Sequence, residues 1–217
     1  MIDDTMALLN ELKKAPYQEI TITAPHSGRI EFLIKETGTK ISGASGTWLE
    51  RPGTLLAYLV REGNHKPIYA QDKGEVMQFF DIADKEFVQA GTPLLKIKHF
   101  LTKQEVMDII LKKALHLFTA PEKGRYYFVF EIDTKIKSQG LRSVRVSEGD
   151  EVLILSRMKR ETIIPYQGPS GIIYTTYFDP NESVDIGSPL FGVCPEGQVD
   201  NIKTVIDKIE SGWEEQE

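Results

Sequence analysis

Cysteine is nearly absent from this chain, which has one cysteine, Cys194, among its 217 residues. A single thiol cannot form an intramolecular disulfide, and it cannot supply a cluster of thiolate ligands to a metal ion. We therefore expect Cys194 to be a buried, unreactive thiol. The four histidines are scattered without metal-ligand spacing, so the sequence predicts no metal site.

Long apolar runs are also missing. No stretch approaches the ~20 consecutive apolar residues that a membrane-spanning helix needs. The first five residues (MIDDT) lack the basic start and the apolar segment of a secretory signal peptide. These two features predict a chain with no membrane span that is located in the cytoplasm.

Positive charge is in deficit, because the formal net charge is −6 and the isoelectric point is near 5.4. A surface that binds nucleic acid or an anionic membrane needs clustered positive charge. The expected partners are therefore proteins or small molecules, and no nucleic acid is expected. The length of the chain allows two domains of modest size, each with its own core.

The spacing of apolar residues divides the chain into helical and β-rich segments. Apolar residues recur with a helical period near both ends and in the middle of the chain. The two long stretches between them alternate with a period of two and are interrupted by glycine and proline. We expect a helical arm, a β-rich domain, a connecting helix, a second β-rich domain and a C-terminal helix at 1–16, 17–99, 100–118, 119–196 and 197–217.

An internal repeat relates the two β-rich stretches. Residues 23–29 (TAPHSGR) recur 96 positions later as residues 119–125 (TAPEKGR), and five of the seven residues are identical. Further matches are Thr39-Lys40-Ile41 with Thr134-Lys135-Ile136, Gly53 with Gly149, and Gly91-Thr92-Pro93-Leu94 with Gly187-Ser188-Pro189-Leu190. A repeat of this kind marks a duplicated structural unit.

In the second repeat, residues 148–164 form two apolar runs around a short charged apex that carries Lys159. Apolar strand pairs with glycine signals stand before and after this apex, and two such halves would close a flattened sandwich. The predicted fold is mostly β, with two tandem flattened β-barrel or sandwich domains and with N-terminal, connecting and C-terminal helices.

Residues 149–162 (GDEVLILSRMKRET) resemble the modified hairpin of the biotinyl/lipoyl carrier-domain family, and in particular its biotinyl branch. That hairpin commonly reads Gly-x-Pro-Leu-x-x-x-Glu-Ala-Met-Lys-Met-Glu-Thr. Arg157 and Arg160 stand where the family has alanine and methionine. Four residues match the pattern without a gap: Met158, Lys159, Glu161 and Thr162.

The resemblance implies that both domains are barrel-sandwich hybrids and that a biotin ligase attaches biotin to Lys159. Met158, Arg157, Arg160 and Glu161 would then take part in recognition of the hairpin. The resemblance further implies a carboxyl carrier that is not itself an enzyme, shuttling carboxybiotin from a biotin carboxylase to a carboxyltransferase or decarboxylase. In the first repeat Gly63 falls at the position of Lys159, so that domain resembles a degenerate copy without an acceptor lysine.

Two other interpretations remain open at this point. A lipoyl carrier typically has aspartate before its lysine, whereas this chain has Met158 there. The chain could also be an unmodified scaffold of tandem domains that binds partners, because a Met-Lys pair is common by chance and a lysine in a turn often serves only solubility.

Overall fold

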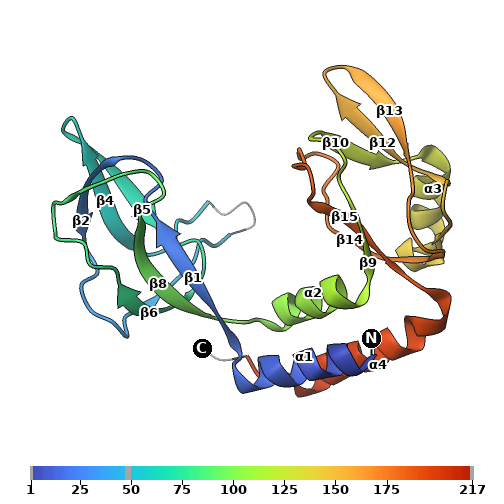
Figure 1. The fold of residues 1–217 in the computed structure, drawn as a ribbon, viewed down its shortest axis with the longest axis horizontal. Helices are drawn as coiled ribbons and strands as arrows, with labels where there is room; N and C mark the ends of the chain where they lie inside the picture. Colours follow the sequence, from blue (N-terminus) through green and yellow to red (C-terminus); the bar gives the residue numbers. More distant parts are fainter. Residues whose placement is uncertain (1, 47–49, 216–217) are drawn as a thin grey trace. The chain divides into compact units, whose positions relative to one another are not determined.

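The computed structural model describes residues 2–46 and 50–215, and Figure 1 shows it as a ribbon. Over these residues the chain is mostly β-structure, in small antiparallel sheets. Along the sequence, helices occur near both ends and between groups of strands. It divides into two compact units. The first unit is Leu12–Thr102, and the second unit combines the residues up to 11 with Lys103–Trp213.

The first unit contains two four-stranded antiparallel sheets, with strand orders β1-β8-β6-β3 and β5-β4-β2-β7. Every strand pair in them is antiparallel, as short connections between sequential strands favour. The strands are β1 Tyr17–Thr23, β2 Gly28–Phe32, β3 Lys40–Ile41, β4 Leu55–Arg61, β5 Asn64–Tyr69, β6 Gly74–Phe79, β7 Phe87–Val88 and β8 Pro93–Phe100.

The core of the first unit consists of two apolar clusters that share strands β4 and β8. Successive residues of a strand point to opposite faces. Leu56 and Ala57 of β4 therefore enter different clusters, and so do Leu94 and Leu95 of β8. All four side chains are buried, so these two strands are the centre of the unit.

The second unit contains a three-stranded sheet, β10-β12-β13, and a four-stranded sheet, β11-β14-β15-β9. A helix, α3, and a 3-10 turn, η1, lie between β10 and β11 in the chain. The elements are β9 His116–Thr119, β10 Arg125–Phe128, α3 Phe130–Gln139, η1 Leu141–Ser143, β11 Arg145–Val146, β12 Glu151–Arg157, β13 Arg160–Pro165, β14 Gly171–Thr176 and β15 Pro189–Cys194.

Aromatic rings form the centre of the second core. Phe118, Tyr166 and Phe191 contact one another with ring centroids 5.1 to 5.8 Å apart. The Tyr166 side chain is fully buried, and its hydroxyl donates a hydrogen bond to the carbonyl oxygen of Pro169 at 2.9 Å. The Tyr166 amide also donates to Asp150 at 2.8 Å, which ties the base of the β12–β13 hairpin to the core.

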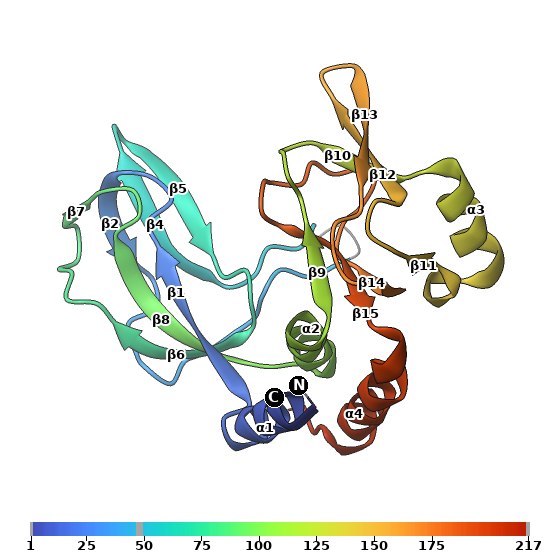
Figure 2. The same cartoon turned by 45° about the vertical axis from the view of Figure 1, so that its right-hand side comes forward.

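The remaining helices are α1 Ile2–Lys14, α2 Lys103–Ala114, the 3-10 turn η2 Glu196–Gln198 and α4 Val199–Gly212. Within the second unit, α2 and α4 pack against the sheet, where Ile202 of α4 joins Tyr174 and Cys194 in one apolar cluster. Figure 2 shows α2 and α4 next to the β9 and β15 end of this unit. None of the described helices is long and apolar enough to cross a bilayer.

Cys194 is buried, as expected from its sequence, and its thiol donates to the carbonyl oxygen of Pro195 at 3.3 Å. Burial raises the pKa of this thiol, so the reactive thiolate is disfavoured. The connecting helix is shorter than the predicted 100–118. Residues at both of its ends belong to strands, because β8 runs to Phe100 and β9 starts at His116.

The second unit repeats the strand topology of the first unit, just as it repeats its sequence. Strands β12 and β13 begin and end 96 positions after β4 and β5. The order β9-β15-β14-β11 matches β1-β8-β6-β3 strand for strand. The pairing of Gly28 with Val88 also recurs as a bridge between Gly124 and Val184. The two units are therefore copies of one β-architecture.

One of the sequence matches is wrong. Residues 134–136 lie within α3, whereas residues 39–41 lead into and form β3. The structural counterpart of β3 is β11, because Ile41 pairs with Gly74 and Val146 with Gly171 in equivalent positions. Inserted α3 and η1 lengthen the chain before β11, and a shorter loop after β11 restores the 96-residue offset.

Helix α3 was not expected, since its sequence has a weak helical signal. Only Ile132 and Ile136 pack against the core, and none of its residues is fully buried. Its N-cap residue, Val129, makes no side-chain capping hydrogen bond, so the usual start signal is absent. Packing of those two isoleucines and the i,i+4 ion pair between Lys137 and Asp133 stabilise the helix.

Candidate functional site

Lys159 lies at the tip of the β12–β13 hairpin. The two strands pair antiparallel from Glu151–Pro165 at the base to Arg157–Arg160 at the tip. Only Met158 and Lys159 remain between them, which makes the connection a two-residue turn. In Figure 1 the orange tip of this hairpin extends beyond the rest of the second unit.

Both turn residues have a left-handed backbone, with φ of 48° at Met158 and 64° at Lys159. Positive φ at both central residues defines the type I′ turn, which matches the twist of the flanking strands and favours Asn-Gly or Gly-Gly. Methionine and lysine pay a steric cost in this conformation because their Cβ atoms approach the backbone carbonyl. The type I′ turn therefore suits the twist of the hairpin strands. Asn-Gly or Gly-Gly would make a more stable turn than Met158 and Lys159 do.

The first unit has the same turn with a different residue at the tip. Glu62 and Gly63 connect β4 and β5, with φ of 52° and 79°. Gly63 occupies the place of Lys159, so the strained position is relieved there by glycine. The structural equivalence of Gly63 and Lys159 agrees with the alignment of the two repeats.

The side chains of the tip are open to solvent. Met158 is 86% exposed, and Lys159 is also exposed. Within the described part of the chain the Lys159 amine has no hydrogen-bond or ion-pair partner. An amine in this position can be reached by the active site of another protein.

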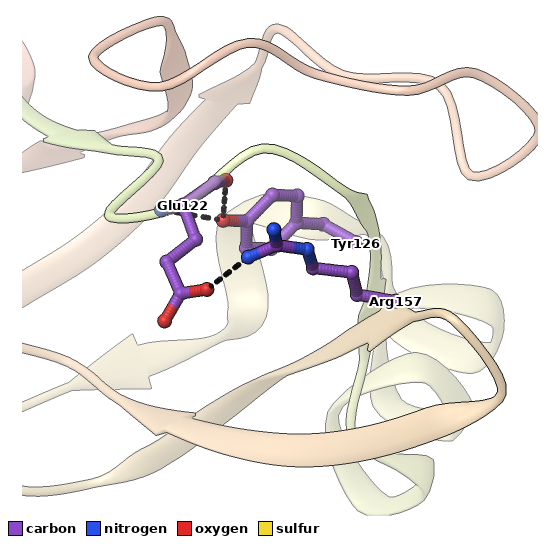
Figure 3. Close-up of polar contacts among 3 residues, drawn as sticks. All are labelled: Glu122, Tyr126 and Arg157. Atoms are coloured by element: carbon purple, nitrogen blue, oxygen red, sulfur yellow. Dashed lines mark hydrogen bonds and ion pairs between the residues drawn. The ribbon is translucent and has the colours of Figure 1, made fainter.

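Arg157 is held by an ion pair to a neighbouring loop, shown in Figure 3. Its Nη1 atom donates to Oε2 of Glu122 at 2.8 Å, and both side chains are about half exposed. The backbone carbonyl of Glu122 accepts a hydrogen bond from the Tyr126 hydroxyl at 2.5 Å. Burial raises the pKa of Tyr126, so this phenol stays protonated and fixes the loop that presents Glu122.

The pairing register assigns the other hairpin residues to two faces. Residues directly opposite each other in an antiparallel pair share a face. Arg160 therefore lies on the same face as Arg157, whereas Glu161 pairs with Ser156 on the other face. Within the described residues the Arg160 side chain has no ion-pair partner. Thus both arginines next to the turn lie on one face, and only Arg157 is neutralised.

A hollow of about 530 Å³ lies on the arginine face of the hairpin. Its apolar part comes from Leu155 and Ile164, and Thr162 lies opposite Leu155 and next to Ile164 on this face. The lining residues are Glu122, Leu155, Arg157, Met158, Arg160, Thr162 and Ile164. This open site therefore begins directly beside Lys159 and combines an apolar floor with charged edges.

The structure brings all five predicted site residues, Met158, Lys159, Arg157, Arg160 and Glu161, to the same hairpin tip, with Glu161 on the opposite face from the arginines. Sequence reasoning did not identify the hollow or the part that Glu122 plays in it. The residues that face each other across the hairpin could have been predicted by counting outward along both strands from a two-residue turn. Glu122 could not, because it comes from a loop 35 residues earlier in the chain.

Comparison with solved structures found a similarity to a chain described as a single-chain, multi-domain long-chain acyl-CoA carboxylase. The two chains are 18% identical, and the match covers 52% of this chain and 11% of that chain with a TM-score of 0.30. A similarity this low assigns neither fold nor function. No protein-family model and no curated protein sequence matched this chain.

Proposed function

We propose that this chain is a biotin carrier in which the Lys159 amine is joined to biotin through an amide bond. Both units then adopt the biotinyl/lipoyl barrel-sandwich fold, and the first is a copy without an acceptor lysine. The observation that carries the proposal is the exposed lysine in a left-handed turn where the duplicated unit has Gly63.

The strain at the tip supports a functional role for Lys159. A left-handed conformation costs a non-glycine residue roughly 1–2 kcal/mol. At the equivalent position the first unit has glycine, Gly63, which adopts this backbone without that cost. Residues held in strained backbone conformations are concentrated at functional sites. Lysine at this position gives the hairpin an accessible primary amine, which glycine cannot supply.

In the attachment step, the Lys159 nitrogen attacks the carboxyl carbon of biotin after a biotin ligase has activated that carboxyl as an adenylate. The C–N amide bond forms, the bond to the phosphate breaks so that AMP leaves, and the amine proton passes to solvent. The chain contributes the nucleophilic amine and its exposed position. The hairpin register keeps the turn two residues long, so the amine stays at the outermost point.

Biotin held on Lys159 would supply the chemistry of a carboxyl carrier between a biotin carboxylase and a carboxyltransferase or decarboxylase. In this proposal the chain is a non-catalytic carrier subunit, and the acids, bases and nucleophiles of the carboxylation and transfer reactions belong to the partner enzymes. Its contribution is tethering, which raises the local concentration of the group at each partner's site. Met158, Arg157, Arg160 and Glu161 are neighbours of Lys159 in the hairpin tip and are the residues that such partners would contact first.

The test is intact-mass analysis after incubation with a biotin ligase, ATP and biotin. We expect a gain of one biotinyl group that is lost in Lys159→Ala and in Lys159→Arg, which keeps the charge. Lys66→Arg is the matched control, because Lys66 is the lysine closest in sequence to the tip of the first hairpin and lies within β5. This variant should gain the same mass as the unaltered protein.

An unchanged mass, with the ligase active on a known carrier, would overturn the proposal. A mass gain that matches a lipoyl group, after incubation with a lipoyl ligase instead, would support the lipoyl alternative. Binding of a partner that is unaffected by Lys159→Ala, in a protein that gains neither group, would support the scaffold alternative.

A further inference from the structure

The proposed attachment to Lys159 needs only an exposed amine. It makes no use of the hollow on the arginine face of the hairpin. Its volume of about 530 Å³ lies within the range of small-molecule sites, ~300–1,000 Å³. It also shares Arg157, Met158 and Arg160 with the immediate surroundings of Lys159. A group attached to this lysine can therefore reach the hollow by folding its flexible arm back along the hairpin.

From this geometry we infer that the hollow is a resting site for the ring system of the group attached to Lys159. This inference rests on the proposed function. The apolar floor of Leu155 and Ile164 suits the hydrocarbon and thioether part of the bicyclic ring. At the edges, the Arg160 guanidinium can donate to the ureido oxygen, and the Glu122 carboxylate can accept from a ureido N–H.

Tethering makes a weak contact sufficient. A short flexible linker gives an attached group a local concentration in the millimolar range. A hollow with only millimolar affinity for the free ring would therefore be occupied for about half of the time. Such a site shields the ring between visits to partner enzymes and still releases it readily.

The first unit supplies an internal comparison, because its corresponding residues do not reproduce these features. At the positions of Glu122 and Arg160 it has His26 and Asn64. Arg61, the counterpart of Arg157, lies 3.7 Å from Glu62 in its own turn rather than pairing with a neighbouring loop. Lys66 stands at the position of Thr162, so a long cation replaces the small side chain on this face. The charged and small residues that line the hollow therefore occur in the unit that has the acceptor lysine and not in the other unit.

The inference can be tested by NMR on the biotinylated full-length protein with labelled leucine, isoleucine and threonine methyl groups. We expect nuclear Overhauser effects between the ring protons of biotin and the methyl groups of Leu155 and Ile164. Thr162→Lys, which installs the residue of the first unit, should abolish them. Ile163→Lys is the matched control, because Ile163 is the next residue along the strand, is 48% exposed and points to the opposite face.

Each variant is first separated from unmodified protein by binding to monomeric avidin, so that only fully biotinylated samples are compared. Biotinylated protein that shows no ring-to-methyl effects would overturn the resting site and leave the proposed carrier function intact. Effects that persist in Thr162→Lys, or that vanish equally in Ile163→Lys, would also overturn it. Failure of the proposed function is recognised separately, because the protein would then gain no biotinyl mass at all.

Discussion

The strain at the hairpin tip predicts that replacement of Lys159 by glycine stabilises the protein. Relief of the left-handed backbone at φ 64° is worth roughly 1–2 kcal/mol. Glycine also gives the unfolded chain more freedom, which costs about 0.4–1 kcal/mol. The exposed Lys159 amine has no partner among the described residues, so no side-chain contact is lost. The net expectation is a gain in the free energy of unfolding of about 0.8 kcal/mol, within a range of about 0–1.6 kcal/mol.

The reciprocal change, Gly63→Lys, isolates the same backbone cost in the first unit. A Cβ atom added at Gly63 meets no atom of the described residues within 4 Å, so the substitution introduces no clash with them. Its φ of 79° remains in the left-handed region. We therefore expect Gly63→Lys to destabilise the first unit by a similar amount, about 0.8 kcal/mol.

The assay is urea unfolding followed by amide hydrogen exchange and mass spectrometry, with peptides from β4 and β12 reporting on the two units separately. In Lys159→Gly the β12 peptides should unfold at higher urea, and in Gly63→Lys the β4 peptides should unfold at lower urea. If neither substitution moves the transition of its own unit, the left-handed turn carries no cost. Strain at the tip would then give no support to a functional role for Lys159.

Three further predictions concern the second unit and are checked by urea unfolding. Burial raises the pKa of Tyr166 to about 12 from the ordinary value of 10.0, so the unfolded chain is favoured as its tyrosine ionises. Stability is unaffected below about pH 10 and falls by about 1.4 kcal/mol per pH unit between there and about pH 12. Tyr166→Phe should remove that part of the fall and cost about 1 kcal/mol near neutral pH; an unchanged alkaline slope would contradict this. Gly171→Ala should destabilise by about 1–3 kcal/mol, because its Cβ would overlap the backbone of β15. Gly197→Ala, where the added Cβ meets nothing within 4 Å, is its control, and equal effects would refute the packing argument. A double-mutant cycle of Glu122→Gln and Arg157→Gln should give a coupling of only about 0.2–1 kcal/mol, since the pair is half exposed. A coupling well above that range would show that the ion pair is shielded from solvent.

The hairpin and its turn were predictable because their signals are local. A continuous apolar run, Val152 to Leu155, marks β12, and the short charged apex after it marks the turn. The repeat supported the predicted turn independently, because Gly63 indicated a tight turn at the position in the first unit that is equivalent to Lys159.

Helix α3 and strand β11 were not predicted, for the opposite reason. The sequence match of 134–136 with 39–41 was stronger than the helical signal of α3, although those residues are not structurally equivalent. The two-residue strand β11 is too short to show a period, and only its pairing with β14 identifies it. Short elements of this kind are determined by their partners rather than by their own residues.

The sequence by itself determined the duplication, the β-rich character of both copies, the place of the hairpin and the presence of one lysine where its counterpart is glycine. These features depend on residues close together in the chain or on a fixed spacing. Only the tertiary structure decided the left-handed conformation of Lys159, the ion pair of Arg157 with Glu122 and the hollow beside them. Those depend on strand register and on the packing of segments far apart in the chain, where the free energy of contacts outweighs local preference.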